Sequence, residues 1–108
     1  MSTDNNLPSA AYVSDTSQRL LRTLDVLFGH EIDGLLPGEI GKLVGCSPAN
    51  TTRDLANLLE AGMCERIDGR GSYRVSARLA SRALASLNAI DEAARQMADL
   101  RQRYTTNI

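Results

Sequence analysis

Apolar residues recur at three- and four-residue spacing in the first part of the chain. The stripe comprises Leu20, Leu21, Leu24, Leu27 and Phe28. This period places the side chains on one face of a helix. A hydroxyl between Ser14 and Ser17 can accept hydrogen bonds from the free N–H groups at the start of that helix, and Gly29 can end it. We therefore expect a helix that begins near Ser14–Ser17 and ends at Gly29.

A short helical pattern and a tight turn follow. The pattern has its apolar positions at Ile40, Leu43 and Val44. Pro37 suits the first position of this helix, and Gly41 leaves room for the close approach of a following helix. The turn reads Gly45-Cys46-Ser47-Pro48. Its glycine can adopt the left-handed conformation that leaves a helix.

The turn leads into a second helix with two different faces. Ser47 is a good N-cap and Pro48 a good first residue, and the pattern runs to Ala61. One face carries Thr51, Leu55, Leu58 and Leu59, and the opposite face carries Asn50, Arg53 and Asn57 beside Ala49. We expect the first face to pack inward and the polar face to remain exposed.

Two alternating runs, residues 63–67 and 73–76, come after Gly62 and predict half-buried strands. The tip between them, residues 68–72, contains two glycines and favours a hairpin. The order of helix, turn, capped helix and hairpin is that of a winged helix-turn-helix. We therefore predict a mainly α fold with a small β-hairpin and a C-terminal helical extension.

The last part of the chain is helical in character. Its first stripe is Leu79, Ala83, Leu84 and Leu87, and its second is Ile90, Ala93, Met97, Leu100 and Tyr104. The second stripe fits the a and d positions of two heptads. It favours dimerisation with a second copy through these five residues, and folding back on the head is the alternative. The pattern leaves open whether the two stripes lie on one helix or two.

These patterns divide the chain into three parts. Residues 1–13 are rich in Ser, Thr, Asn, Asp and Pro and read as a disordered arm. Residues 14–76 form the winged helix-turn-helix domain, and residues 77–108 form the helical extension.

Composition narrows the possible functions. With 43% hydrophobic residues, no Trp and one Phe, the core must be aliphatic. No apolar run is long enough to cross a membrane and no secretory signal is visible, so we expect a cytoplasmic protein. His30, Cys46 and Cys64 are too few and too widely spaced for a zinc site. We expect no metal, no cofactor and no catalytic residue, and we expect both cysteines to be buried apolar residues.

Charge is distributed unevenly along a chain of net charge −1. Residues 1–65 hold four Lys/Arg and nine Asp/Glu, whereas residues 66–108 hold eight Arg and four Asp/Glu. The positive residues gather at Arg66, Arg70, Arg74, Arg78 and Arg82. Such a local patch is typical of nucleic-acid binders, although a solvated face of an ordinary domain gives the same pattern.

The second helix of a helix-turn-helix reads base edges in the major groove of DNA. Asn can pair with adenine and Arg with guanine in bidentate fashion. For the recognition helix, residues 48–61, the expected base contacts are Ala49, Asn50, Arg53 and Asn57. The expected backbone contacts are Lys42, Ser47, Thr52, Arg70, Ser72 and Arg74. The wing, residues 67–74, would lie on the backbone or in the minor groove.

Two other functions compete with DNA reading. Winged helices also serve as protein-interaction modules without DNA binding, and the acidic first half of the chain suits that role. An enzyme would need a nucleophile, metal cluster or phosphate loop. The lone His30 beside Glu31 offers none of these.

Residues 17–87 resemble the N-terminal DNA-binding domain of IclR-type transcriptional regulators. The family's Ser-x-x-Arg-x-Leu-x-x-Leu helix is similar to residues 17–24. Its Gly-Leu-(Ser/Thr)-x-x-Glu-Ile-Ala segment matches residues 34–41 at Gly, Leu, Glu and Ile, and its turn and recognition helix match residues 45–55 at Gly, Arg and Leu. Residues 61–66 and 73–75 resemble the start and end of its wing. The resemblance implies a DNA-binding transcriptional regulator. Together with the heptads of the helical extension, it leads us to expect a homodimer that binds double-stranded DNA sequence-specifically.

Some positions depart from the family pattern. Leu36 stands where a hydroxyl would cap the helix at Pro37, which costs about 1 kcal/mol or shifts the start of the helix. Cys46 and Thr51 replace larger core residues, and the base-reading positions differ. The family's C-terminal effector domain has no counterpart here, so a stand-alone unit is expected and a small-molecule effector is not implied.

Overall fold

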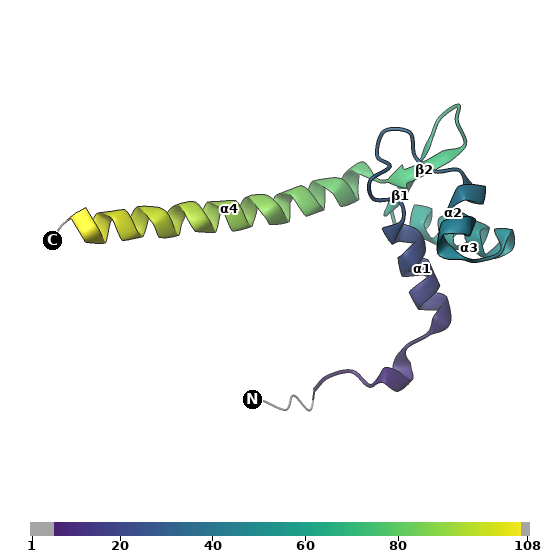
Figure 1. Cartoon of the computed structure of the whole chain (residues 1–108), viewed down its shortest axis with the longest axis horizontal. Helices are drawn as coiled ribbons and strands as arrows, with labels where there is room; N and C mark the ends of the chain where they lie inside the picture. The colour runs from purple at the N-terminus through teal and green to yellow at the C-terminus, as the bar shows by residue number, and fades with distance from the viewer. Residues whose placement is uncertain (1–5, 107–108) are drawn as a thin grey trace.

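The computed structural model describes residues 6–106 as a helical head, a hairpin and one long helix that leaves the head (Figure 1). The elements are η1 (Ala10–Tyr12), α1 (Asp15–Asp25), α2 (Pro37–Val44), α3 (Pro48–Glu60), β1 (Cys64–Ile67), β2 (Ser72–Val75) and α4 (Ala77–Thr106). The predicted winged helix-turn-helix is confirmed. Of the expected arm, residues 6–13 contain the short η1 turn, and residues 1–5 lie outside the described residues.

Helix α1 begins where its sequence predicts and ends earlier. The Ser14 hydroxyl accepts a hydrogen bond from Ser17 N at 3.0 Å. The helix stops at Asp25, because Leu27 N and Phe28 N donate to carbonyls three residues back at 3.1 and 3.2 Å. The expected end at Gly29 is therefore wrong. Leu27 still reaches the core, whereas Phe28 is 47% exposed.

Helix α2 begins at Pro37 although Leu36 has no capping group. The Glu39 carboxylate instead accepts a hydrogen bond from Leu36 N at 2.9 Å, which satisfies one of the free donors at the helix start. The helix start is therefore not shifted. A Cβ on Gly41 would lie 3.0 Å from Thr51 Oγ1, so the expected close approach of the two helices is confirmed at that position.

Helix α3 packs on the head with one face. The Ser47 hydroxyl caps it by accepting from Asn50 N at 3.2 Å, and Gly45 has the expected left-handed φ of 80°. Its buried residues are Thr51, Asp54, Leu55 and Leu58. Leu59 is 40% exposed, so its expected place on the inner face is wrong, and a carboxylate is buried instead.

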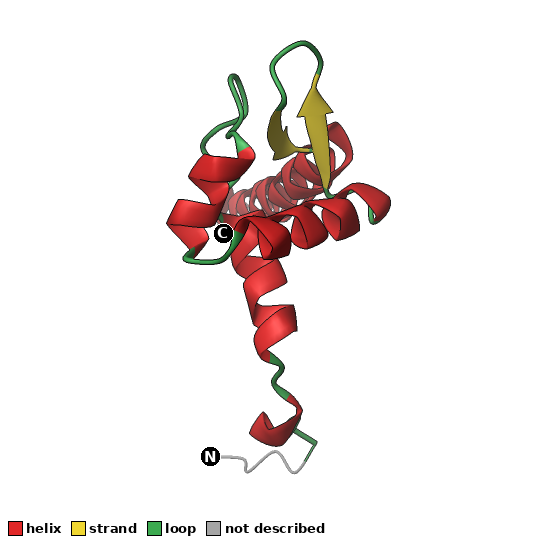
Figure 2. Cartoon of the chain, turned by 90° about the vertical axis from the view of Figure 1, so that its right-hand side faces the viewer, coloured by secondary structure: helices red, strands yellow, loops and turns green. Residues whose placement is uncertain are grey.

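The hairpin pairs β1 with β2 in antiparallel register from Cys64↔Val75 to Ile67↔Ser72. A third segment fastens it to the head, because Leu35 and Tyr73 exchange two backbone hydrogen bonds of 2.8 Å. Figure 2 shows the hairpin standing beside the loop that precedes α2. Gly34 is required there, because its φ is 69° and a Cβ would lie 2.7 Å from Tyr73 O.

The core is aliphatic, as expected. It consists of Leu27, Leu35, Ile40, Leu55, Leu58, Cys64 and Val75. Burial raises the pKa of the Cys64 thiol to about 11, so this thiol is protonated at neutral pH. Cys46 is only partly buried and its Sγ lies 3.3 Å from Thr51 Oγ1. The expectation that both cysteines are buried therefore holds for Cys64 alone.

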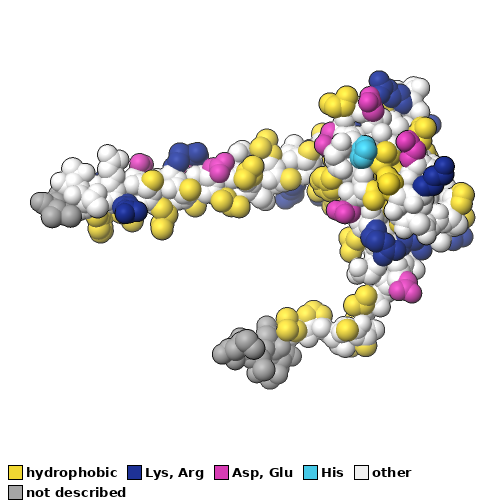
Figure 3. Space-filling view, in the orientation of Figure 1, with side chains coloured by type: hydrophobic (Ala, Val, Ile, Leu, Met, Phe, Trp, Pro, Cys, Tyr) yellow, Lys and Arg dark blue, Asp and Glu magenta, His cyan; other side chains and the backbone are white. Residues whose placement is uncertain are grey.

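Helix α4 is a single rod of 30 residues, which corresponds to about 45 Å. It projects away from the head (Figure 1), and every described residue after Leu79 is exposed. Hydrophobic side chains lie exposed along this helix (Figure 3). Both apolar stripes thus share one helix, and the alternative of folding back on the head does not occur.

The start of α4 is fixed directly to the wing. The Ser76 hydroxyl donates to Gly62 O at 2.7 Å and accepts from Leu79 N at 3.0 Å. The Glu65 carboxylate accepts from Ala77 N at 2.9 Å and pairs with Arg74 Nε at 3.0 Å. The hydrogen bond from Ala77 N lowers the pKa of Glu65 most, and the pair with Arg74 lowers that pKa further. The wing and α4 therefore meet without a flexible linker.

Candidate nucleic-acid interface

The outward face of α3 gathers the residues predicted to contact bases. Arg53 Nη1 donates to Asn50 Oδ1 at 3.3 Å, and Asn57 Nδ2 donates to Arg53 O at 2.8 Å. Ala49 is exposed at the start of the same helix. The Arg53 guanidinium keeps further donors, since it carries five N–H groups. Asn57 uses one of its two amide N–H groups on the helix and keeps the other, together with its oxygen, for a further contact.

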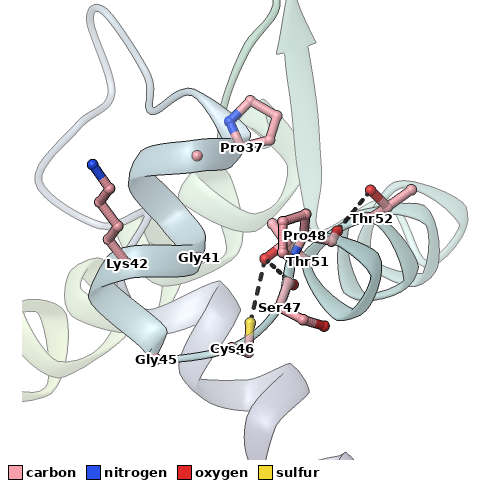
Figure 4. Close-up of a pocket in the computed structure, with 10 residues that line it drawn as sticks. Pro37, Gly41, Lys42, Gly45, Cys46, Ser47, Pro48, Thr51 and Thr52 are labelled. Carbon is pink, nitrogen blue, oxygen red and sulfur yellow. Dashed lines mark hydrogen bonds between the residues drawn. The ribbon is translucent and has the colours of Figure 1, made fainter.

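A groove of about 480 Å³ lies between α2, the turn and the start of α3 (Figure 4). Most of the residues that line it are small, and Lys42, Ser47 and Thr52 are among them. The Ser47 hydroxyl accepts from Asn50 N and can still donate its own proton, whereas the Thr52 hydroxyl donates to Pro48 O at 3.0 Å. All three residues line the groove, and their ammonium and hydroxyl groups are of the kind that binds phosphate oxygens. The Lys42 side chain projects away from α3 (Figure 4).

The other predicted backbone contacts lie on the wing, where each has a different partner. Arg70 lies at the exposed tip and pairs with the Asp33 carboxylate. Ser72 is buried and its hydroxyl donates to Asp33 O at 2.8 Å. Arg74 pairs with Glu65 and also donates to Glu31 O at 3.3 Å. Ser72 and Arg74 thus hold the wing to the head, and their contact with DNA stays an untested prediction.

The five arginines of the basic stretch do not share one face. The register pairs Glu65 with Arg74 and Arg66 with Tyr73, so Arg66 and Arg74 point to opposite faces of the hairpin. Arg78 NH1 donates to Ala61 O at 3.4 Å, at the base of α4. The charge is therefore spread around the wing, and Arg70 is the member at its tip.

A partly buried ion pair behind α3 was not predicted. Arg19 Nε and Nη2 of α1 donate to Asp54 Oδ2 and Oδ1, respectively, each at 2.9 Å. Thr23 Oγ1 also donates to Asp54 Oδ2 at 3.0 Å. These hydrogen bonds raise the pKa of Arg19. The sequence signal for this pair was an acidic residue, Asp54, directly before Leu55 of the inner face, and an arginine in the middle of α1.

Within residues 6–106, no three His, Cys, Asp or Glu side chains cluster in a way that could bind a metal ion. No helix of this part of the chain is both long and apolar enough to span a membrane.

Comparison with known proteins gives a match to a solved structure. No protein-family model and no curated protein matches the chain. Among solved structures, the chain is similar to a protein of Silicibacter sp. TM1040 that is proposed to be an IclR transcriptional regulator. The TM-score is 0.59 and the identity 26%, over 75% of this chain and 32% of that one. The chain thus spans about a third of that regulator. This likeness supports the fold of a DNA-binding regulator.

Proposed function

We propose that this protein is a sequence-specific transcriptional regulator that binds double-stranded DNA through α3. The observation that carries the proposal is the polar outer face of α3, with Asn50 and Arg53 joined by a hydrogen bond of 3.3 Å. This face belongs to a winged head that is similar to that of a proposed transcriptional regulator. Residues at these positions of a helix-turn-helix face base edges in the major groove.

Two side chains would read bases directly. Asn50 suits adenine, because its amide can donate and accept at the same time, and Arg53 suits guanine O6 and N7. Their mutual hydrogen bond limits the rotamers of both before DNA arrives. Ala49 would face a thymine methyl group, and the Asn57 oxygen would accept from a base further along the groove.

Phosphate contacts would come from both sides of α3. Lys42, Ser47 and Thr52 line the groove between α2 and α3, and Arg70 stands at the wing tip. Arg70 would exchange Asp33 for a phosphate group. Thr52 would rotate its hydroxyl away from Pro48 O to donate to the DNA backbone.

A second copy of the chain would bind along α4. Ile90, Met97, Leu100 and Tyr104 are between 46% and 72% exposed, and together with Ala93 they follow one line along the helix. The charged residues Asp91, Glu92 and Arg95 lie on the opposite side. A helix with an apolar seam and a charged back suits a two-helix pair, and such a dimer would read two half-sites.

A protein-interaction module is the second candidate. It is favoured by the acidic partners of the wing, since Asp33 and Glu65 neutralise Arg70 and Arg74. In that case α3 would face a protein partner. Binding would then depend weakly on salt, because no counterions would be released from DNA.

Selection from a random duplex DNA pool at about 50 and about 200 mM salt tests the proposal. We expect enrichment of a palindrome, with affinity that falls steeply at the higher salt concentration. The Arg53→Ala variant serves as a control and should fail to enrich the same sequence. Absence of any binding at low salt would reject DNA as the ligand and favour the interaction module.

A further inference from the structure

The recognition helix carries a carboxylate on its buried side. Asp54 is 2% exposed, and its two oxygens accept three hydrogen bonds from α1, two from Arg19 and one from Thr23. We propose that Arg19 is a positioning residue, which sets the rotation of α3 through Asp54 and thereby sets how well the protein discriminates DNA sequences. This inference rests on the proposed function.

The geometry ties α3 to α1 in one orientation. Arg19 and Thr23 lie one turn apart on α1, and they hold both oxygens of a single carboxylate on α3. The fork of the guanidinium matches a carboxylate only in one plane. Rotation of α3 about its axis would therefore break at least one of the three hydrogen bonds.

Asp54 is close to the residues that would read DNA. Arg53 precedes it directly, and Asn50 lies one turn before it on the same helix. A side-chain tip lies about 5–6 Å from the axis of its helix, so a rotation of about 10° moves it by about 1 Å. Binding groups must be held within about 0.5 Å and 10–20° to act well. A small rotation of α3 would therefore disturb base contacts.

Stability alone does not account for this pair. Buried ion pairs can often be replaced by apolar residues of similar volume without loss of stability. Leucine contacts, such as those of Leu55 and Leu58 with the core, tolerate small shifts because they have no preferred direction. The directional contact between α1 and α3 is the one that fixes the angle of α3.

The test replaces the pair by apolar residues in the full chain, as Arg19→Met with Asp54→Leu. Arg95→Met is the matched control, because it removes a hydrogen-bonded Arg–Glu pair, Arg95 with Glu92, on α4 away from the head. Affinity is measured on the selected operator and on random duplex, and folding by thermal unfolding. The angle between α1 and α3 is measured without DNA by residual dipolar couplings of backbone N–H groups.

We expect the double variant to stay folded and to lose about tenfold in affinity for the operator, comparable to the loss of one bidentate base contact. Affinity for random duplex should change by less than about twofold, because phosphate contacts carry little sequence information. The couplings should report a changed angle of α3, and Arg95→Met should change none of these values. Unchanged operator affinity and an unchanged angle in a folded variant would overturn the proposal.

A milder variant covers the case in which the double variant does not fold. Arg19→Lys keeps the charge and loses the fork, and it should also lower operator affinity more than random-duplex affinity. Equal loss on both DNAs, or no loss, would count against the proposal. If the wild-type protein selects no DNA sequence, the proposed function fails, and the angle of α3 alone decides whether Arg19 positions the helix.

Discussion

Helices α3 and α4 carry similar apolar spacing but have different surroundings. On α3, Leu55 and Leu58 are 3% and 4% exposed and belong to the core. On α4, Ile90 and Met97 are 67% and 70% exposed. The same apolar spacing thus forms part of the core on α3 and an exposed apolar face on α4. An apolar period in a sequence predicts a helix face without specifying its partner.

The largest effect should come from the buried face of α3. Leu58→Ala should lower the free energy of unfolding by about 2–5 kcal/mol, because it leaves a cavity in a core of few residues. Leu84→Ala on α4 is the matched control, and at 57% exposure it should cost less than about 0.5 kcal/mol. Chemical denaturation measures both. Equal losses would show that α4 is as well packed as α3.

Charges on the seam of α4 should separate the proposed dimer. Met97→Asp with Leu100→Asp should give a monomer in sedimentation, because two carboxylates per chain would meet their copies along the seam. The control Asn88→Asp with Gln102→Asp adds the same charge on the opposite side of the helix and should leave the mass unchanged. If the first pair of substitutions leaves both the dimer and the folded head intact, the dimer interface does not lie along this seam.

A smaller effect is expected at the outer face of α3. Arg53→Ala should weaken operator binding by about 1–3 kcal/mol and relax the preference at one base pair. Lys42→Ala should instead weaken all sequences equally and reduce the salt slope by about one. Titrations at several salt concentrations distinguish the two. If Arg53→Ala behaves like Lys42→Ala, then Arg53 contacts only the DNA backbone.

Removal of an acid at the wing should strengthen binding slightly. Asp33→Asn frees Arg70 from its carboxylate partner, so DNA affinity should rise by up to about 1 kcal/mol, the range of an exposed ion pair. Glu92→Gln removes a comparable carboxylate on α4 and should have no effect. A decrease in affinity for Asp33→Asn would mean that the pair holds Arg70 in its binding position.

The smallest effect concerns pH and the base of α4. The pKa of Glu65 is lowered in the folded state by Ala77 N and Arg74. Its contribution to stability is therefore present above the unfolded pKa of about 4.3 and is lost as pH falls through the folded value. Glu65→Gln should flatten the acid side of the stability curve measured by thermal unfolding. An identical pH dependence in the variant would exclude this role.

Local signals predicted the order of elements and most of their starts. Ser14, Pro37 and Ser47 act at their own helix ends, so their roles follow from nearby sequence. The end of α1 did not follow, because the chain tightens at Leu27 to bring that residue into the core. Leu35 was missed for a similar reason, since its strand-like pairing depends on Tyr73 far along the chain.

The candidate site was predictable only on its exposed side. The polar face of α3 follows from helical spacing, whereas the burial of Asp54 depends on Arg19 in another helix. The basic stretch suggested one patch. The hairpin register places Arg66 and Arg74 on opposite faces. Two of the arginines are paired with acids, Arg70 with the distant Asp33 and Arg74 with Glu65 across the hairpin.

The junction of the wing with α4 has a consequence for the spacing of DNA targets. Ser76 and Glu65 clamp the first turn of α4, so the helix acts as a stiff lever arm joined to the head. Two such helices paired along their apolar seams would hold both heads at one fixed separation and orientation. One added base pair between the half-sites turns one half-site relative to the other by about 35°. A rigid dimer could not follow that rotation, so the protein would discriminate operators by the spacing of their half-sites as strictly as by their base sequence.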